Sequence, residues 1–399
     1  MSKIFLARNK GCKTPLNLNR RKSRLNKAKL LPNANCLLGE REWNEMKSTI
    51  PSFVSIFVCC AGFVQASEGR LKVWPFVSFL LLFTTVDFLV IIIANFEPNG
   101  LKISLTLLLT LTLTFLMHFL LSRKRRRLSI LLLKLQYLPS STKERLFNLL
   151  ILVINLIPWV EAISVTVLCD KKLTAAEYAF GKEVENQWAQ IVLILLKEYI
   201  CLFSYPTFPC LIAALYCTIC VRCSYAIRNL TRSIALSSPE EFGPSEQIKA
   251  LRYKVKIDEI LKITQEIFST PSFCLIVATS MSCYSILGWY LIGDLNIIQL
   301  IEGATVGVCS FLCLIGTLWT AGTLPVELKK LKDTFYKKAF SRWISFRFPS
   351  EENSRTEILD KPDFVFTGCD VLSYTRSSVF AIVGAIVTYT VLIINMPEI

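Results

Sequence analysis

The sequence predicts an all-α membrane protein with seven transmembrane helices, an inside N-terminus, an outside C-terminus and cytoplasmic helical extensions. Of its 399 residues, 53% are hydrophobic and only 19% are charged, and the mean hydropathy is +0.48. Soluble domains carry about 45–50% apolar and about 25% charged residues. Several apolar runs reach the roughly 20 residues that a helix needs to cross the ~30 Å hydrocarbon core. This composition excludes a water-soluble enzyme, a disordered protein and a collagen-like protein.

The chain divides into a basic tail and one membrane domain. Residues 1–50 are predicted to be a disordered cytoplasmic tail, with Arg20-Arg21-Lys22-Ser23-Arg24 at its centre. Residues 51–396 are predicted to form the seven-span domain. Its first apolar stretch, 51–65, is about 15 residues long, which suits an interfacial or buried helix better than a span. The seven predicted spans are 74–95, 101–121, 147–169, 189–222, 271–294, 297–324 and 376–396.

The fourth span is too long for a simple crossing, and Pro206 and Pro209 predict that it is kinked or divided. Beyond it, apolar residues within 222–270 recur at helical spacing, which predicts helices that pack together below the membrane. The residues of this stripe are Tyr253, Ile257, Ile260, Leu261 and Phe268, with Thr264 interrupting it.

The distribution of basic residues predicts the orientation. With the N-terminus inside, the inner segments 1–73, 122–146, 222–270 and 325–376 hold 40 of the 45 Lys and Arg residues, and the outer loops hold four. Basic residues collect on the cytoplasmic side of membranes. The net charge of +15 is therefore a topology signal and does not indicate a nucleic-acid partner. This orientation is opposite to that of a G-protein-coupled receptor, and it places the sequon at Asn229 inside.

The last span carries a motif. Thr388-Tyr389, five mostly apolar residues and Asn395 resemble the Thr-Tyr-five-residues-Gln-Phe signature of the arthropod gustatory receptor family. The segment from Phe366 to Leu372 is similar to the Gly-aromatic segment that precedes the seventh span in that family. The chain departs from the family pattern at three positions: Asn395 stands for Gln, Met396 for Phe, and Asp370 for an apolar or aromatic residue.

The resemblance implies a ligand-gated, non-selective cation channel of the plasma membrane, acting in taste signal transduction as a homotetramer or as a heteromer with related receptors. It implies that the seventh spans surround the pore and that Leu392, Asn395 and Met396 line it near its outer constriction. Leu392 and Met396 are spaced i, i+4, so they share one helix face with Asn395 beside them. The alternative for Asn395 is a position in the lipid headgroup region.

Polar residues in the outer halves of the spans predict a small-molecule site, which the family would use for a tastant. Acidic residues within spans are costly and usually face protein or water, and aromatic walls with a few polar groups are typical of ligand pockets. The candidates are Asp87, Trp159, Glu161, Trp289, Tyr290 and Glu302. The alternative is interfacial aromatic residues and structural salt bridges, with Lys197 as a partner.

No pattern indicates an enzyme, a cofactor or a metal site. Thr106, Thr110, Thr114 and the single histidine, His118, form a stripe with a predicted structural role. Cys217, Cys220 and Cys223 share a helix face without a fourth zinc ligand, so packing cysteines are favoured over a metal site or palmitoylation. The alternative function is a secondary transporter of a small solute, although no repeat between the halves supports it. A mitochondrial targeting role for the basic N-terminus lacks an amphipathic face.

Overall fold

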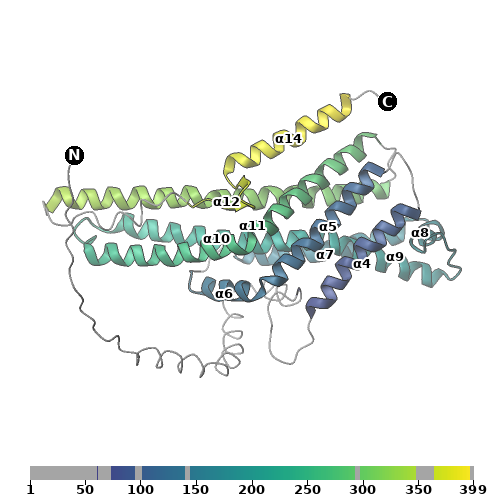
Figure 1. Cartoon of the computed structure of the whole chain (residues 1–399), viewed down its shortest axis with the longest axis horizontal. Coiled ribbons are helices and arrows are strands. Elements are labelled where there is room, and N and C mark those ends of the chain that lie inside the picture. Colours follow the sequence, from purple (N-terminus) through teal and green to yellow (C-terminus); the bar gives the residue numbers. More distant parts are fainter. Residues whose placement is uncertain are drawn as a thin grey trace, which may run out of the picture.

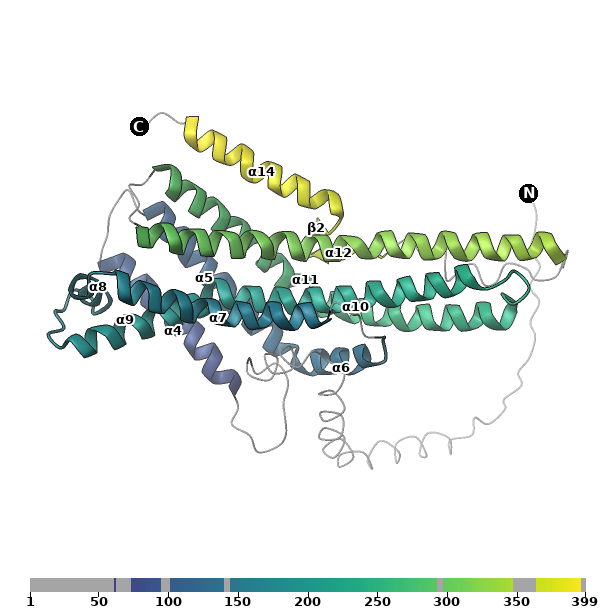
Figure 2. The same cartoon turned by 180° about the vertical axis from the view of Figure 1, so that it is seen from behind.

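The computed structural model describes residue 61 and residues 73–94, 101–139, 144–292, 297–346 and 364–395. The predicted tail at 1–50, most of 51–65, and Met396 lie outside the described residues. Figures 1 and 2 show a long bundle in which α10, α11 and α12 run along most of the length, while α4, α5, α7, α8 and α9 gather at one end. The opposite end consists of the extensions of α10, α11 and α12.

The helices of the first half follow the predicted spans closely. They are α4 (Val73–Ala94), α5 (Leu101–Arg123), α6 (Arg125–Gln136), α7 (Glu144–Leu168) and α8 (Lys171–Tyr178). Three of these match the first three predicted spans within three residues at each end. Apolar side chains on α4 and α7 are largely exposed, as expected for helices that face lipid.

The fourth span is broken where its prolines predict a break. Helix α9 (Gln187–Leu202) leads into the short π-helical turn η1 (Phe203–Thr207), and α10 (Phe208–Leu236) continues 14 residues past the predicted end of the span at residue 222. Tyr205 has extended backbone angles inside this turn, next to Pro206. Proline removes a helical hydrogen bond and clashes with the preceding turn, which explains the position of the kink. Together α9 and α10 form the centre of the fold, with 89% of the most apolar part buried.

The helices of the second half confirm the predicted extensions beyond the membrane. Helix α11 (Pro244–Ile292) has 49 residues and α12 (Ile297–Phe346) has 50, about twice the length of a span. The predicted stripe on α11 faces the core: Ile257, Leu261 and Phe268 are at most 1% exposed. Ion pairs of Arg127 with Glu266, at 3.2 Å, and of Lys134 with Glu259, at 2.5 Å, link α6 to the extension of α11.

A two-stranded hairpin, not expected from the sequence, precedes the last helix. Strands β1 (Thr367–Gly368) and β2 (Leu372–Ser373) are antiparallel, and α14 (Arg376–Asn395) follows. The turn places Cys369 and Asp370 at φ of 51° and 58°, a left-handed conformation in which Asp is enriched. Gly368 packs against Tyr374, and a Cβ there would lie 2.3 Å from the Tyr374 hydroxyl. The Gly-aromatic segment is thus a tight hairpin held against α11.

Six helices in the described part of the chain are long and apolar enough to cross a membrane, and α14 is a shorter apolar helix. Helix α14 lies on the outside of the bundle, against α11 and α12 (Figures 1 and 2). Its exposed side chains include Phe380, Tyr389 and Leu392, which are 71%, 58% and 53% exposed. A soluble protein would not leave such an apolar helix half uncovered.

Candidate ligand-binding site

A cavity of about 160 Å³ lies among five helices and the turn η1, near the end of the bundle that carries α8. Aromatic and aliphatic side chains form most of its wall, and the polar groups among them are Glu198, Tyr205, Ser285 and Glu302. Its full lining is Phe88, Leu107, Leu111, Glu198, Cys201, Leu202, Tyr205, Ser285, Ile286, Trp289, Glu302, Gly303 and Val306. Ligand pockets usually span about 300–1,000 Å³, so this cavity suits a small ligand.

The kink at η1 shapes one side of the cavity. Because Tyr205 leaves the helical path there, its ring enters the space between α9 and α12. Its hydroxyl lies 2.9 Å from the Ser310 hydroxyl, which in turn lies 3.2 Å from that of Ser282. This chain of hydroxyls satisfies the buried phenol and fixes its position.

Two polar groups define what the cavity can recognise. Ser285 is 8% exposed and its hydroxyl has no hydrogen-bond partner among the described residues. A buried hydroxyl without a partner costs roughly 1–3 kcal/mol, which a ligand with a matching group would recover. Glu302 contributes a carboxylate from α12. The arrangement can accept and donate hydrogen bonds to one small polar molecule between apolar walls.

The second carboxylate of the cavity is already engaged. Glu198 accepts a hydrogen bond from the Tyr178 hydroxyl, which joins α9 to α8. Burial and the Glu198 charge raise the pKa of Tyr178 well above its usual range, so the phenol stays protonated and donates. Sequence reasoning missed Glu198, although a second charge beside Lys197 in an apolar segment was a usable signal. Tyr178 carried no such signal, because it lies in a polar loop sequence.

Two of the six predicted pocket residues, Trp289 and Glu302, line the cavity, and Asp87 precedes the lining residue Phe88 in the chain. Asp87 forms an ion pair with Lys197, and the two side chains are 13% and 16% exposed. The Lys197 ammonium also lies over the rings of Phe83, at 5.6 Å, and Phe180, at 5.2 Å. For Asp87 the structure therefore contains the salt bridge that was the alternative to a ligand role.

The other three predicted residues do not line the cavity. Trp159 is 48% exposed on α7 and packs against Tyr199, with ring centroids 4.2 Å apart. The Tyr290 hydroxyl donates to the Leu300 carbonyl at 2.6 Å and so joins α11 to α12. Glu161 is 5% exposed, and neither carboxylate oxygen has a hydrogen bond within the described part of the chain.

The predicted pore residues lie at the end of α14. Leu392 is half exposed, the backbone of Asn395 ends the helix, and Met396 is outside the described residues. Of the family motif, Thr388 bonds the Gly384 carbonyl at 2.9 Å, and the Tyr389 ring lies 5.3 Å from that of Tyr284 on α11. The motif tyrosine thus attaches α14 to the bundle.

The polar stripe and the cysteines have structural positions. The hydroxyls of Thr110 and Thr114 bond carbonyls four residues earlier, at 2.8 and 2.9 Å. His118 is fully buried, with its two ring nitrogens 3.2 Å from the Ser78 hydroxyl and 3.3 Å from the Ala61 carbonyl. Cys217, Cys220 and Cys223 are at most 7% exposed inside the bundle, which agrees with the packing interpretation.

Comparison with solved structures identifies the fold. The structure is similar to the insect olfactory receptor OR5 from Machilis hrabei, with a TM-score of 0.68 at 10% identity, covering 89% of this chain and 99% of the receptor. A second structure of that receptor, in complex with eugenol, gives a TM-score of 0.57 at 10% identity, covering 88% and 99%. No protein-family model and no curated protein matches the sequence.

The similarity covers nearly the whole of both chains, so this protein has the fold of an insect olfactory receptor. This confirms the predicted all-α, seven-helix membrane fold, in which α14 is the last span. The predicted orientation and the pore residues stay predictions.

Proposed function

We propose that this protein is a gustatory-type chemosensory receptor, a ligand-gated, non-selective cation channel that assembles as a tetramer in the plasma membrane. The observation that carries the proposal is the fold it shares with an insect olfactory receptor over 89% of its length. The Thr388-Tyr389 motif supports the gustatory assignment. One fold can host many functions, so a chemosensory role also requires a ligand-binding site.

Helix α14 supports the assembly. It contacts α11 and α12 on one side only and leaves Phe380, Val387 and Leu392 more than half exposed. In our proposal, four copies of α14 surround a central pore, so these side chains face lipid, neighbouring subunits or the pore. Apolar rings at Leu392 gate the pore by dewetting, and amides at Asn395 give the ion a temporary partner.

The cavity beside η1 is the proposed tastant site. Its size suits a small molecule, its walls are apolar and aromatic, and Ser285 and Glu302 offer groups for a ligand hydroxyl or amine. The similar olfactory receptor has been solved with the small molecule eugenol, which makes small organic compounds the first ligands to screen.

The test is whole-cell recording with ion substitution and matched surface expression. We expect a ligand-gated cation current in the parent, a stronger preference for cations in Asn395→Asp, and a suppressed current in Asn395→Lys, because a charge in a narrow pore is poorly screened. Leu392→Ser should raise the current without ligand. If all three variants conduct like the parent, the pore assignment is wrong. If labelled solute accumulates without any current, the protein is a transporter.

A further inference from the structure

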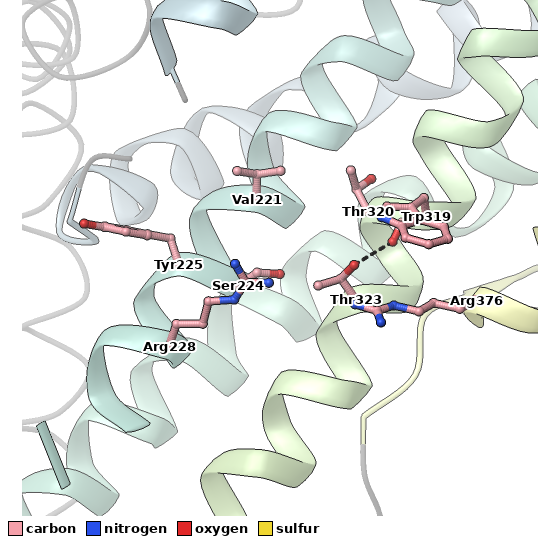
Figure 3. A pocket seen from close by; sticks show the side chains of 8 residues that line it. All are labelled: Val221, Ser224, Tyr225, Arg228, Trp319, Thr320, Thr323 and Arg376. Atoms are coloured by element: carbon pink, nitrogen blue, oxygen red, sulfur yellow. Dashed lines mark hydrogen bonds between the residues drawn. The ribbon is translucent and has the colours of Figure 1, made fainter. Parts of the chain in front are cut away.

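A second cavity, of about 180 Å³, lies between α10, α12 and the first residue of α14. It shares no lining residue with the candidate tastant site. Figure 3 shows Arg228 and Arg376 reaching into the space between the two long helices from opposite sides, while Tyr225 points away. The residues that line it are Val221, Ser224, Tyr225, Arg228, Trp319, Thr320, Thr323 and Arg376.

The cavity is predicted to lie at one level of the membrane. The sequence predicts that the fourth span ends near residue 222, that the sixth ends near 324, and that the seventh begins at 376. All three boundaries meet in this one cavity. Trp319 is 45% exposed there, and Trp is enriched at the membrane–water interface. The basic-residue distribution assigns this interface to the cytoplasmic side, where anionic lipids are concentrated.

Positive charge exceeds negative charge around the cavity. Arg228 lies 3.1 Å and Lys330 lies 3.4 Å from the same oxygen of Glu327, which is 5% exposed. Arg376 adds a third cation, and no carboxylate in the described part of the chain pairs with it. Glu327 thus pairs with two cations, Arg376 is a third, and the excess positive charge favours an anion.

The guanidinium of Arg376 is positioned by an aromatic ring and keeps a free hydrogen-bond donor. It stacks on the Trp319 ring at 5.2 Å, and its Nε is buried without a hydrogen-bond acceptor. At Gly322, α12 lies so close to the start of α14 that a Cβ there would lie 2.6 Å from the backbone nitrogen of Arg376. The planar Arg fork matches phosphate oxygens in geometry, so Arg376 is positioned to donate to a phosphate.

A neutral donor completes the site. Ser224 is 6% exposed, and its hydroxyl has no hydrogen-bond partner among the described residues. In contrast, the hydroxyls of Thr320 and Thr323 each bond a carbonyl of their own helix at 2.8 Å. One cavity is therefore lined by two residues with unsatisfied buried donors, the Ser224 hydroxyl and the Arg376 Nε, and a ligand that accepts hydrogen bonds would satisfy them.

We propose that this cavity binds the phosphate headgroup of an anionic lipid from the inner leaflet. The apolar surface above it favours a lipid over a soluble phosphate. Leu312 and Phe311, seven and eight residues before Trp319 and so on the same face of α12, are 62% and 39% exposed and provide a track for an acyl chain. The bound headgroup bridges α10, α12 and α14, and so ties the last span to the centre of the fold.

The experiment measures lipid retention directly and does not depend on channel activity. The full-length protein, purified in detergent, is incubated with an equimolar mixture of phosphatidylinositol phosphate and phosphatidylcholine, and native mass spectrometry counts the lipid that stays bound. We expect retention of the anionic lipid, and a loss of about tenfold in affinity for Arg376→Gln, about 1.4 kcal/mol, since the variant loses the charge-assisted hydrogen bond to the phosphate. Arg232→Gln, an exposed arginine one turn beyond Arg228, is the matched control and should retain the lipid.

Two results would overturn the inference. Equal retention by Arg376→Gln and Arg232→Gln would show that surface charge alone attracts the lipid. Full competition by the soluble inositol phosphate headgroup, without acyl chains, would show that the ligand is a soluble phosphate. If Arg376→Gln lowers the melting temperature, Ser224→Ala serves as the second variant, because it removes only the free hydroxyl and should still weaken retention severalfold.

Discussion

Asp87 and Lys197 form an ion pair inside the helical bundle. Both are less than a fifth exposed, and they join α4 to α9 beside the candidate tastant cavity. A buried charge that loses its partner is costly, whereas replacing both partners with apolar groups is often neutral. The pair should therefore show strong coupling in a double-mutant cycle.

We expect Asp87→Leu alone to destabilise the protein by about 3 kcal/mol, because Lys197 is left buried without a counter-charge. The double variant Asp87→Leu, Lys197→Met should recover most of that loss. Thermal unfolding of the purified protein in detergent measures both. If the double variant is as unstable as the sum of the single variants, the ion pair contributes nothing of its own.

Two tryptophans near the candidate tastant site provide a matched pair. Trp289 lines the cavity, whereas Trp159 is 48% exposed and packs against Tyr199. We expect Trp289→Ala to shift ligand sensitivity by about tenfold or more, since removing one good aromatic contact costs about 2 kcal/mol or more. Trp159→Ala should change sensitivity little.

The measurement is a concentration–response curve at matched surface expression. A shift for Trp159→Ala without one for Trp289→Ala would place the ligand on the outer face of α7 instead. Loss of expression in both variants would point to packing roles for both rings.

At the scale of elements, the close approach of α12 to the start of α14 is set by one glycine. A Cβ at Gly322 would lie 2.6 Å from the backbone nitrogen of Arg376 and 2.7 Å from the carbonyl carbon of Thr375. Backbone atoms cannot move aside as a flexible side chain can. Gly322→Ala should therefore push α14 away from α12 and destabilise the protein by about 1–3 kcal/mol.

Gly316 is the control, because a Cβ there meets nothing within 4 Å. Gly316→Ala should be neutral or stabilising by roughly 0.5–1 kcal/mol, since Ala costs less conformational entropy in a helix. Melting temperatures of the two variants compare them directly. Equal behaviour of the two glycines would mean that α14 is not held against α12 at this point.

At the scale of the whole molecule, the orientation rests on the basic-residue count and can be tested by glycosylation. An acceptor sequon engineered at residues 182–186, between α8 and α9, should be modified because this loop is predicted to face outside. The native sequon at Asn229 lies on the extension of α10 and should stay unmodified. Gel mobility with and without glycosidase treatment measures whether each of the two sites is glycosylated. Glycosylation at Asn229 without glycosylation of the engineered loop would show that the orientation is the reverse of the predicted one.

The span boundaries, the kink near Pro206 and the extensions of α11 and α12 follow from the sequence alone. They depend on local properties: the run of apolar residues needed to cross the membrane, the missing N–H of proline, and the helical period of Ile257, Ile260 and Leu261. Each of these can be counted along the chain. The C-terminal motif also led to the right fold class, through Thr388 and Tyr389.

The side-chain partners were decided by the tertiary structure. The sequence places Asp87, Glu161 and Glu302 at similar depth, but only packing decides that Asp87 meets Lys197, that Glu302 lines the cavity and that Glu161 does neither. The reason is geometric. The sequence predicts how deep a residue lies in the membrane, but its contacts also depend on the rotation of its helix and on which helices lie next to it. The arginine cavity illustrates the same point: Arg228 and Arg376 are 148 positions apart in the chain, and only the packing of α14 against α12 brings them to one space.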